Sequence, residues 1–196
     1  MKYRNRYWSG KFRALLLLAA VITLQGCAEA VVIGGMGGLV AINDARTTKG
    51  WYQDQAIEKA ALRALSKDRQ LNKHGNISVT SFNGTVLMAG QVKTKALKKR
   101  AATLIAALEG VSRVHNEIVV TSTLNSSWGR DSYLTAKVKS KMFFNDFDGT
   151  RVKVVSDSGN VYLMGLLSRS ESEQVVAMVS KVDGIRSVTK VFEYVD

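Results

Sequence analysis

The stretch that decides the fold is ISVTSFNGTVLMAGQV, residues 77–92, because the chain contains it twice. Its second copy is VKVVSDSGNVYLMGLL, residues 152–167, displaced by 152 − 77 = 75 positions. In both copies two apolar runs flank a central glycine, Gly84 in the first copy and Gly159 in the second. Two short apolar runs separated by such a turn are typical of a β-hairpin.

The similarity continues downstream of the hairpin. LEGVSRVHNEIVV, residues 108–120, matches VDGIRSVTKVFEY, residues 182–194, at a displacement of 74. A fixed spacing of this kind is the signature of an internal repeat. We therefore divide the chain into a first repeat, residues 53–121, and a second repeat, residues 131–196.

Each repeat reads as α-β-β-α-β. Its opening helix is predicted by apolar residues four positions apart, which share one helix face: Ile57, Ala61 and Leu65 in the first repeat, and Leu134, Val138 and Met142 in the second. Asn83 and Gly84 suit a tight hairpin turn. A strand, a helix and a further strand in one sheet favour a right-handed parallel crossover. The expected fold class is α+β, with a three-stranded mixed sheet and two helices on one face in each repeat.

The second helix of each repeat carries start and stop signals. In the first repeat it is expected to begin after Thr94, and in the second at Ser170, with Glu173 three positions later as a capping box. Gly110 and Gly184 are expected to end these helices, because glycine adopts the left-handed conformation without strain.

The N-terminal 26 residues indicate export. Five basic residues precede ALLLLAAVITL, residues 14–24, which is an apolar run of 11 residues. A bilayer-spanning helix needs about 20 residues, so residues 1–26 are read as a signal peptide. The run ends in LQGC, which resembles the bacterial lipoprotein signal and implies acylation of Cys27, the one cysteine. Ala28 after it implies transfer to the outer membrane, with the body of the protein facing the periplasm.

Residues 27–50 are read as the lipidated N-terminus and a flexible tether. From Gly35 they contain G-M-G-G-L-V, where a dinucleotide-binding fingerprint would need a third glycine at Val40. The formal charge is +12, and removal of five signal-peptide charges leaves 12 − 5 = +7. Such a charge favours an anionic partner. Export makes nucleic acid an unsuitable one, so we expect an anionic membrane.

Glycine positions of the two repeats support a family resemblance. The α-β-β-α-β order, the hairpin glycine and the glycine that closes the second strand, Gly90 and Gly165, resemble the BON domain. Two such domains, residues 51–121 and 131–196, behind a lipoprotein signal are similar to dual-BON outer-membrane lipoproteins. The resemblance implies phospholipid binding, support of envelope integrity and enrichment at the division site.

The sequence nominates no catalytic group and no cofactor. His74 and His115 have no acid and nucleophile at a recognisable spacing, and two histidines without free cysteines do not make the usual zinc set. We therefore expect a binding protein with neither a metal nor a cofactor.

The candidate lipid-binding residues cluster around KSKMFFNDFDG, residues 139–149, in the second repeat. Helical spacing places its rings away from the core face and beside lysines, which is the composition of an interfacial membrane contact. The candidates are Trp128, Tyr133, Lys137, Lys139, Lys141, Phe143, Phe144 and Phe147.

Two alternatives stay open at this point. Phe143, Phe144 and Phe147 could instead fill a seam between the repeats, because units of about 65 residues bury only some 60% of their surface. The chain could also act as an interaction scaffold for envelope assembly or cell-wall remodelling proteins. That reading uses either the exposed sheet faces or the basic helix of the first repeat, where residues 51–120 hold 11 Lys and Arg against 5 acids.

Overall fold

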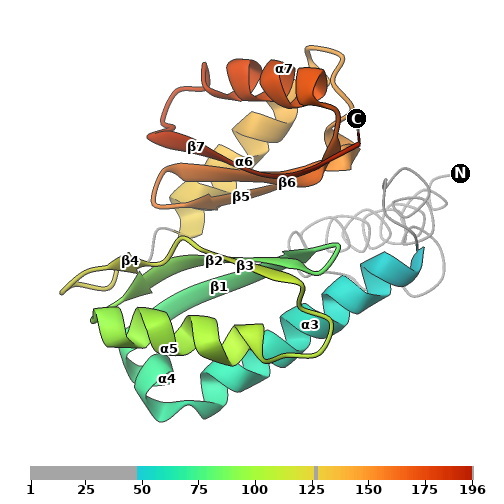
Figure 1. Ribbon diagram of the computed structural model, residues 1–196. Helices are drawn as coiled ribbons and strands as arrows, with labels where there is room; N and C mark the ends of the chain where they lie inside the picture. The colour runs from blue at the N-terminus through green and yellow to red at the C-terminus, as the bar shows by residue number, and fades with distance from the viewer. Residues whose placement is uncertain (1–47, 126–127, 196) are drawn as a thin grey trace, which may run out of the picture. The chain divides into compact units, whose positions relative to one another are not determined.

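The computed structural model describes residues 48–125 and 128–195 (Figure 1). The expected signal peptide, Cys27 and nearly all of the tether lie outside these residues. The described elements follow the chain as α3 Thr48–Lys67, α4 Arg69–His74, β1 Gly75–Phe82, β2 Thr85–Val92, α5 Lys95–Ala106, β3 Arg113–Asn116, β4 Val119–Val120, α6 Trp128–Phe143, the 3-10 helix Gly149–Arg151, β5 Val152–Asp157, β6 Asn160–Leu167, α7 Arg169–Val179 and β7 Ser187–Tyr194.

Both expected hairpins are present. β1 pairs antiparallel with β2, and β5 pairs antiparallel with β6. Asn83 and Gly84 both adopt positive φ, 52° and 76°, as a two-residue turn of this hand requires. Residues 113–116 and β7 then return parallel to the middle strands β2 and β6. The prediction of an α+β chain with two mixed sheets is confirmed.

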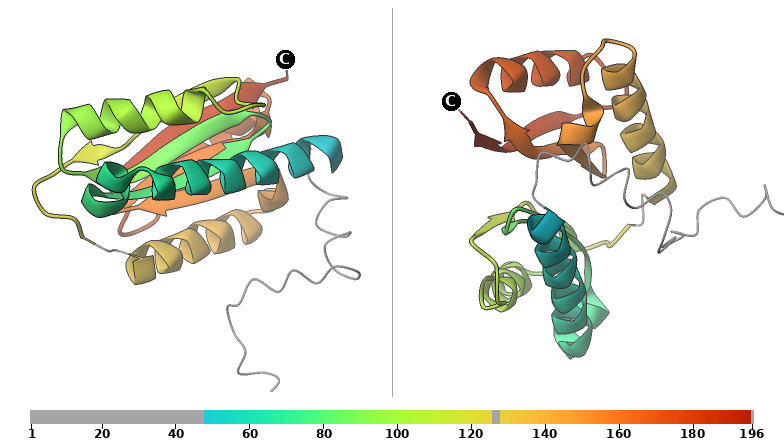
Figure 2. Two further views of the ribbon diagram at one scale, coloured as in Figure 1. Left: turned by 90° about the horizontal axis from the view of Figure 1, so that it is seen from below. Right: turned by 90° about the vertical axis from the view of Figure 1, so that its right-hand side faces the viewer.

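The helices cover one face of each sheet. Ile57, Ala61 and Leu65 of α3 are buried against β2 and α5, and Leu134, Val138 and Met142 of α6 are buried against β5, β6 and α7. Figure 2 (left) shows α3 and α5 side by side in front of the first sheet. The four-residue spacing therefore identified the core face of both opening helices.

Three details differ from the expected order. The first repeat contains an additional short helix, α4, whose N-cap Asp68 accepts hydrogen bonds from the backbone N–H groups of Gln70 and Leu71. Its last strand is divided into β3 and β4, both paired with β2, so the first sheet has four strands instead of the expected three. The second repeat inserts the 3-10 helix between α6 and β5. Each repeat is thus an elaborated version of α-β-β-α-β.

The expected helix signals are correct for α5 and wrong for α7. Thr94 caps α5 by accepting a hydrogen bond from the Leu97 N–H. The capping box of α7 is formed by Ser168 and Glu171, two positions before the expected pair. Both helices also end before their glycines, which adopt left-handed conformations in the following turns.

The second face of each sheet is also buried. The described residues belong to one compact unit, in which the faces opposite the helices pack through Phe82, Leu87, Ala89, Tyr162, Met164 and Val191. Burial raises the pKa of the Tyr162 phenol to about 12. Lys153 Nζ lies 2.7 Å from Glu58 Oε1 at the edge of this cluster. The seam between the repeats is therefore made by the sheets.

Candidate functional site

Phe143 and Phe144 lie at the C-terminal end of α6 and are the most exposed large apolar side chains among the described residues. Their exposed fractions are 75% and 80%. The two rings contact each other edge to face, with centroids 5.6 Å apart. Neither ring belongs to the seam cluster, so the proposed packing of these rings between the repeats is not what the structure shows.

Phe147 does not join the exposed pair. After Phe143 the chain turns, with Asp146 at a φ of 53°, and the Phe147 N–H returns to the Met142 carbonyl at 3.1 Å. The Phe147 ring is then half-buried against the core of the second repeat. We expected it beside Phe143 and Phe144, and that placement is wrong because the helix ends before it.

The three expected lysines precede the ring pair along α6 and lie in different environments. Lys137 Nζ donates a hydrogen bond to the Asp183 carbonyl at 3.0 Å and lies 5.8 Å from the centre of the Tyr133 ring. Lys139 is exposed and Lys141 is half-buried. Tyr133 is 68% exposed. Trp128, the remaining candidate, is the first residue of α6.

A groove of about 430 Å³ runs between α6 and the loop after α7. Three ammonium groups border it, from Lys137, Lys141 and Lys181, and the exposed Phe144 lies at its edge. Lys181 was not predicted, because the sequence places it 40 positions from Lys141 and only the packing of α7 against α6 brings the two together.

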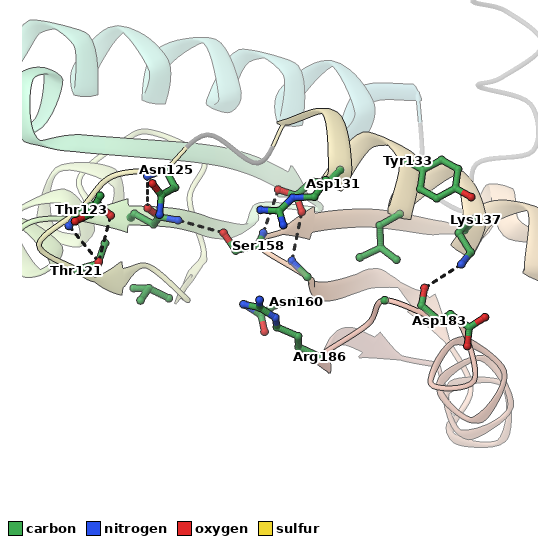
Figure 3. Close-up of a pocket in the computed structure, with 16 residues that line it drawn as sticks. Thr121, Thr123, Asn125, Asp131, Tyr133, Lys137, Ser158, Asn160, Asp183 and Arg186 are labelled. Atoms are coloured by element: carbon green, nitrogen blue, oxygen red, sulfur yellow. Dashed lines mark hydrogen bonds between the residues drawn. The ribbon is translucent and has the colours of Figure 1, made fainter.

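A second, larger pocket of about 700 Å³ adjoins this groove and shares Tyr133, Lys137 and Asp183 with it (Figure 3). Its walls come from the segment that joins the repeats, the start of α6, the β5–β6 turn and the loop before β7. Arg130 and Arg186 also line it. Neither arginine was among the predicted site residues.

Hydrogen bonds fix the walls of this larger pocket. The Asp131 carboxylate accepts the backbone N–H groups of Ser158 and Gly159 at 3.0 and 3.3 Å. The buried Gln91 amide donates to the Ser158 hydroxyl at 3.1 Å and accepts the Asn125 N–H at 2.9 Å. Figure 3 shows the bonds from Asp131 and the bond to the Ser158 hydroxyl meeting at the β5–β6 turn.

The local charges are of both signs. Burial, followed by the nearby Asp131 carboxylate, raises the pKa of Asp157 above its ordinary value.

His74 and His115 are half-buried, and among residues 48–125 and 128–195 no group of three or more metal-ligating side chains is found. Within the same residues, no helix is both long enough and apolar enough to cross a bilayer.

Comparison with known proteins identifies the two repeats. The BON domain family matches residues 53–122 and 130–196. The chain is 38% identical to outer membrane lipoprotein DolP of Haemophilus influenzae, over 92% of this chain and 95% of that protein. It is 34% identical to a 21 kDa hemolysin of Actinobacillus pleuropneumoniae, over 78% and 79% of the two chains. It is 27% identical to osmotically-inducible protein Y of Escherichia coli, over 89% and 90%.

These similarities bear on localisation and family together. The similarity to an outer membrane lipoprotein over nearly the whole chain agrees with the lipoprotein signal at Cys27. The expected localisation at the outer membrane is therefore confirmed, and an orientation toward the periplasm is consistent with it. The names of these three relatives indicate no catalytic activity. With both repeats matched, the chain belongs to the BON domain family and carries two BON domains.

Proposed function

We propose that the second BON domain binds anionic phospholipid at the exposed end of α6, and that the lipoprotein supports envelope integrity through this contact. The observation that carries the proposal is the exposure of Phe143 and Phe144 next to Lys137, Lys139 and Lys141. Aromatic rings enter the acyl boundary of a bilayer, while neighbouring ammonium groups meet lipid phosphates. Tyr133 and Trp128 lie on the same helix, nearer to its N-terminus.

The internal repeat supplies a comparison for these residues. The buried triplets of α3 and α6 are displaced by 134 − 57 = 77 positions, so Phe143 and Phe144 correspond to Ser66 and Lys67. The first repeat therefore folds without rings at this end of the helix. Two exposed rings that the fold does not need are a binding surface rather than a structural requirement.

The expected affinity is modest. A lysine near an anionic leaflet contributes about 1 kcal/mol, so three contribute roughly 3 kcal/mol. Partial burial of two rings adds roughly 2 kcal/mol, which together correspond to a dissociation constant on the order of 0.1–1 mM. Because acylated Cys27 would already hold the protein at the bilayer, such an affinity is sufficient to orient the domain.

The test uses residues 28–196 without the lipid. All three hydrophobic clusters lie between Ile57 and Phe192, so this chain retains every contact within them. Phe143→Ala with Phe144→Ala is expected to lower binding to phosphatidylglycerol vesicles by about tenfold or more in a sedimentation assay. The unfolding temperature should not change, because both rings are exposed.

The matched control is Tyr52→Ala with Leu62→Ala. Both residues are exposed on α3, at 65% and 54%, and their replacement removes a similar apolar surface from the first domain. This variant should bind vesicles as the unchanged chain does. Equal binding by both double variants, with no dependence on salt, would contradict the lipid contact.

A second candidate function is a protein-interaction scaffold for envelope assembly or cell-wall remodelling factors, including those of the division site. It is favoured by residues 69–108, which contain seven Lys and Arg and no acid. No large apolar side chain is exposed among residues 63–118, so this surface suits an acidic partner. Binding of such a partner should survive replacement of Lys137, Lys139 and Lys141 by Ala.

The proposal includes the processing of the chain. Residues 1–26 act as the signal peptide, residues 27–50 as the lipidated N-terminus and tether, and residues 51–121 and 131–196 as the two domains. Cys27→Ala should abolish acylation, seen as loss of the lipid mass by mass spectrometry of the purified protein. Recovery of a lipidated protein from this variant would refute the anchor.

A further inference from the structure

We propose that the pocket between α6, the β5–β6 turn and the loop before β7 binds a phosphate ester of a small polyol through Arg130 and Arg186. This site goes beyond the proposed membrane contact of Phe143 and Phe144, which lies at the opposite end of α6 from Arg130. The pocket volume of about 700 Å³ falls within the usual range of small-molecule sites, about 300–1,000 Å³.

The first argument is the balance of donors. Among residues 48–125 and 128–195, neither guanidinium group has an ion pair or a side-chain hydrogen bond, and both line the pocket. Lys137 adds an ammonium group at the edge shared with the groove. Guanidinium groups bind phosphate with paired, charge-assisted hydrogen bonds. The pocket therefore presents unused donors to an anion.

The acids of the pocket do not neutralise these cations directly. The Asp131 carboxylate is directed to the backbone N–H groups of Ser158 and Gly159. Lys137 Nζ donates its hydrogen bond to the main-chain carbonyl of Asp183 and not to the carboxylate. Asp183 is an exposed residue. Figure 3 shows Lys137 directed to Asp183 at one end of the pocket and Asp131 directed to the Ser158 turn.

The second argument is that contacts with the β5–β6 turn hold Arg186 in place at the pocket. The Arg186 N–H donates to the Gly159 carbonyl at 2.8 Å. A Cβ atom at Gly159 would lie 3.2 Å from Cγ and Cδ of Arg186, so the arginine stem rests directly on the turn. Because Asp131 and Gln91 fix the same turn, the base of the pocket and the stem of this arginine are held together.

The third argument comes from the repeat. At the displacements of 77 and 74 positions, Arg130 and Arg186 correspond to Gln53 and Ser112, and Lys137 corresponds to Ala60. The capping aspartate is common to both repeats, since Asp54 accepts the Asn83 and Gly84 N–H groups as Asp131 accepts those of Ser158 and Gly159. The fold thus requires the aspartate and not the three cations.

The hydroxyl groups of the ligand are assigned to the uncharged wall of the pocket. Asn125, Thr123 and Asn160 are among the uncharged residues that line the pocket, and Asn160 lies near Arg186 (Figure 3). Amide and hydroxyl groups both donate and accept, which suits the hydroxyls of a polyol. A polyol carrying one phosphate matches this combination of neutral and cationic groups.

The test is an NMR titration of residues 28–196 with glycerol 3-phosphate, inorganic phosphate and uncharged glycerol. If the ligand is soluble, glycerol 3-phosphate should shift the backbone amides of residues 130, 159, 160 and 186, and glycerol should not. Arg130→Gln with Arg186→Ser installs the residues of the first repeat. This double variant should raise the dissociation constant of glycerol 3-phosphate by about tenfold or more.

The matched control is Arg63→Gln with Arg113→Ser, which removes the same charge from two exposed arginines outside the pocket. This control should leave the dissociation constant nearly unchanged. Equal weakening in the two variants, or no pocket shift with any phosphate ester or with vesicles, would overturn the site.

Vesicles separate the two sources of the phosphate ester. If the ligand is a lipid headgroup, Arg130→Gln with Arg186→Ser weakens binding to phosphatidylglycerol vesicles and glycerol 3-phosphate alone gives no shift. If the ligand is soluble, glycerol 3-phosphate binds and the variant keeps its vesicle binding. Phe143→Ala with Phe144→Ala should retain the pocket shifts in the second case, so failure of the membrane contact and failure of the pocket give different results.

Discussion

The two BON domains have the same backbone fold and differ in the side chains that their opening helices expose. In both domains a buried apolar triplet fixes the helix, and an aspartate near its start caps the hairpin turn. At the end of α3 the chain has Ser66 and Lys67, whereas at the end of α6 it has Phe143 and Phe144. The features held in common are those that specify the fold, and the differing residues are the candidates for binding.

Charge separates the domains as well. Residues 51–120 carry a net charge of 11 − 5 = +6, while residues 130–196, which include Arg130, carry 10 − 9 = +1. The nearly neutral domain nevertheless has the exposed rings and the two arginines that share a pocket. Local arrangement, and not net charge, therefore distinguishes the domain to which we assign lipid binding.

The largest effect is expected for the glycines that close the middle strands. Gly90→Ala would place a Cβ atom 2.1 Å from the Asn76 carbonyl oxygen, on a backbone with a φ of 118°. Because the clash is with paired backbone, we expect a loss of about 3 kcal/mol or more in the free energy of unfolding. Gly165→Ala meets the Arg151 carbonyl oxygen at 2.6 Å without positive φ, so its loss should be smaller. Urea unfolding of both variants measures the difference, and equal losses would contradict it.

A smaller effect is expected for the capping aspartates. Asp54 is fully buried and accepts hydrogen bonds from the Ser81 hydroxyl at 2.7 Å and from the N–H groups of Asn83 and Gly84. Asp54→Ala leaves buried donors without their acceptor and should cost about 3 kcal/mol. Asp131→Ala, at a half-buried site, should cost about 1–2 kcal/mol. Thermal unfolding checks the order, and a more damaging Asp131 variant would show that the two turns do not depend on their aspartates in the same way.

Sequence patterns predicted the elements more reliably than their ends. The apolar triplets, the hairpins and the Thr94 cap follow from local chemistry, and the structure contains all of them. The capping box was misplaced because SRSESE, residues 168–173, contains two Ser-x-x-Glu matches two positions apart. Only the end of β6 at Leu167 selects Ser168 and Glu171.

The seam and the pocket depend on contacts between distant segments. A signal for the seam was present, since β2 is apolar along nearly its whole length, and such strands are buried on both faces. Arg130 and Arg186 are 56 positions apart and share no local pattern. Aligning the repeats residue by residue would have identified both, because the first repeat has Gln53 and Ser112 in their places.

The smallest effect concerns the second helices. α7 begins with the Ser168 and Glu171 capping box, which Arg151 extends, whereas α5 begins with Thr94 alone and has no acid in its first turn. Ser168→Ala and Thr94→Ala should each cost about 1 kcal/mol at neutral pH. The two helix starts should differ in pH dependence, because only the capping box of α7 contains a carboxylate, that of Glu171. The backbone hydrogen bond from Ser168 and the Arg151 guanidinium lower the pKa of Glu171 to about 2.

Because the folded pKa of Glu171 lies below its unfolded value of about 4.3, its contribution is complete above that unfolded value and is lost as the pH falls toward 2. Glu171→Gln should therefore be less stable than the unchanged chain at pH 7, by about 1 kcal/mol, and the difference should shrink as the pH falls to about 2 and disappear below that pH. The cost of Thr94→Ala should stay constant over the same range, since threonine does not titrate there. Guanidinium chloride unfolding at a series of pH values measures both, and a constant cost of Glu171→Gln would show that its charge does not stabilise α7.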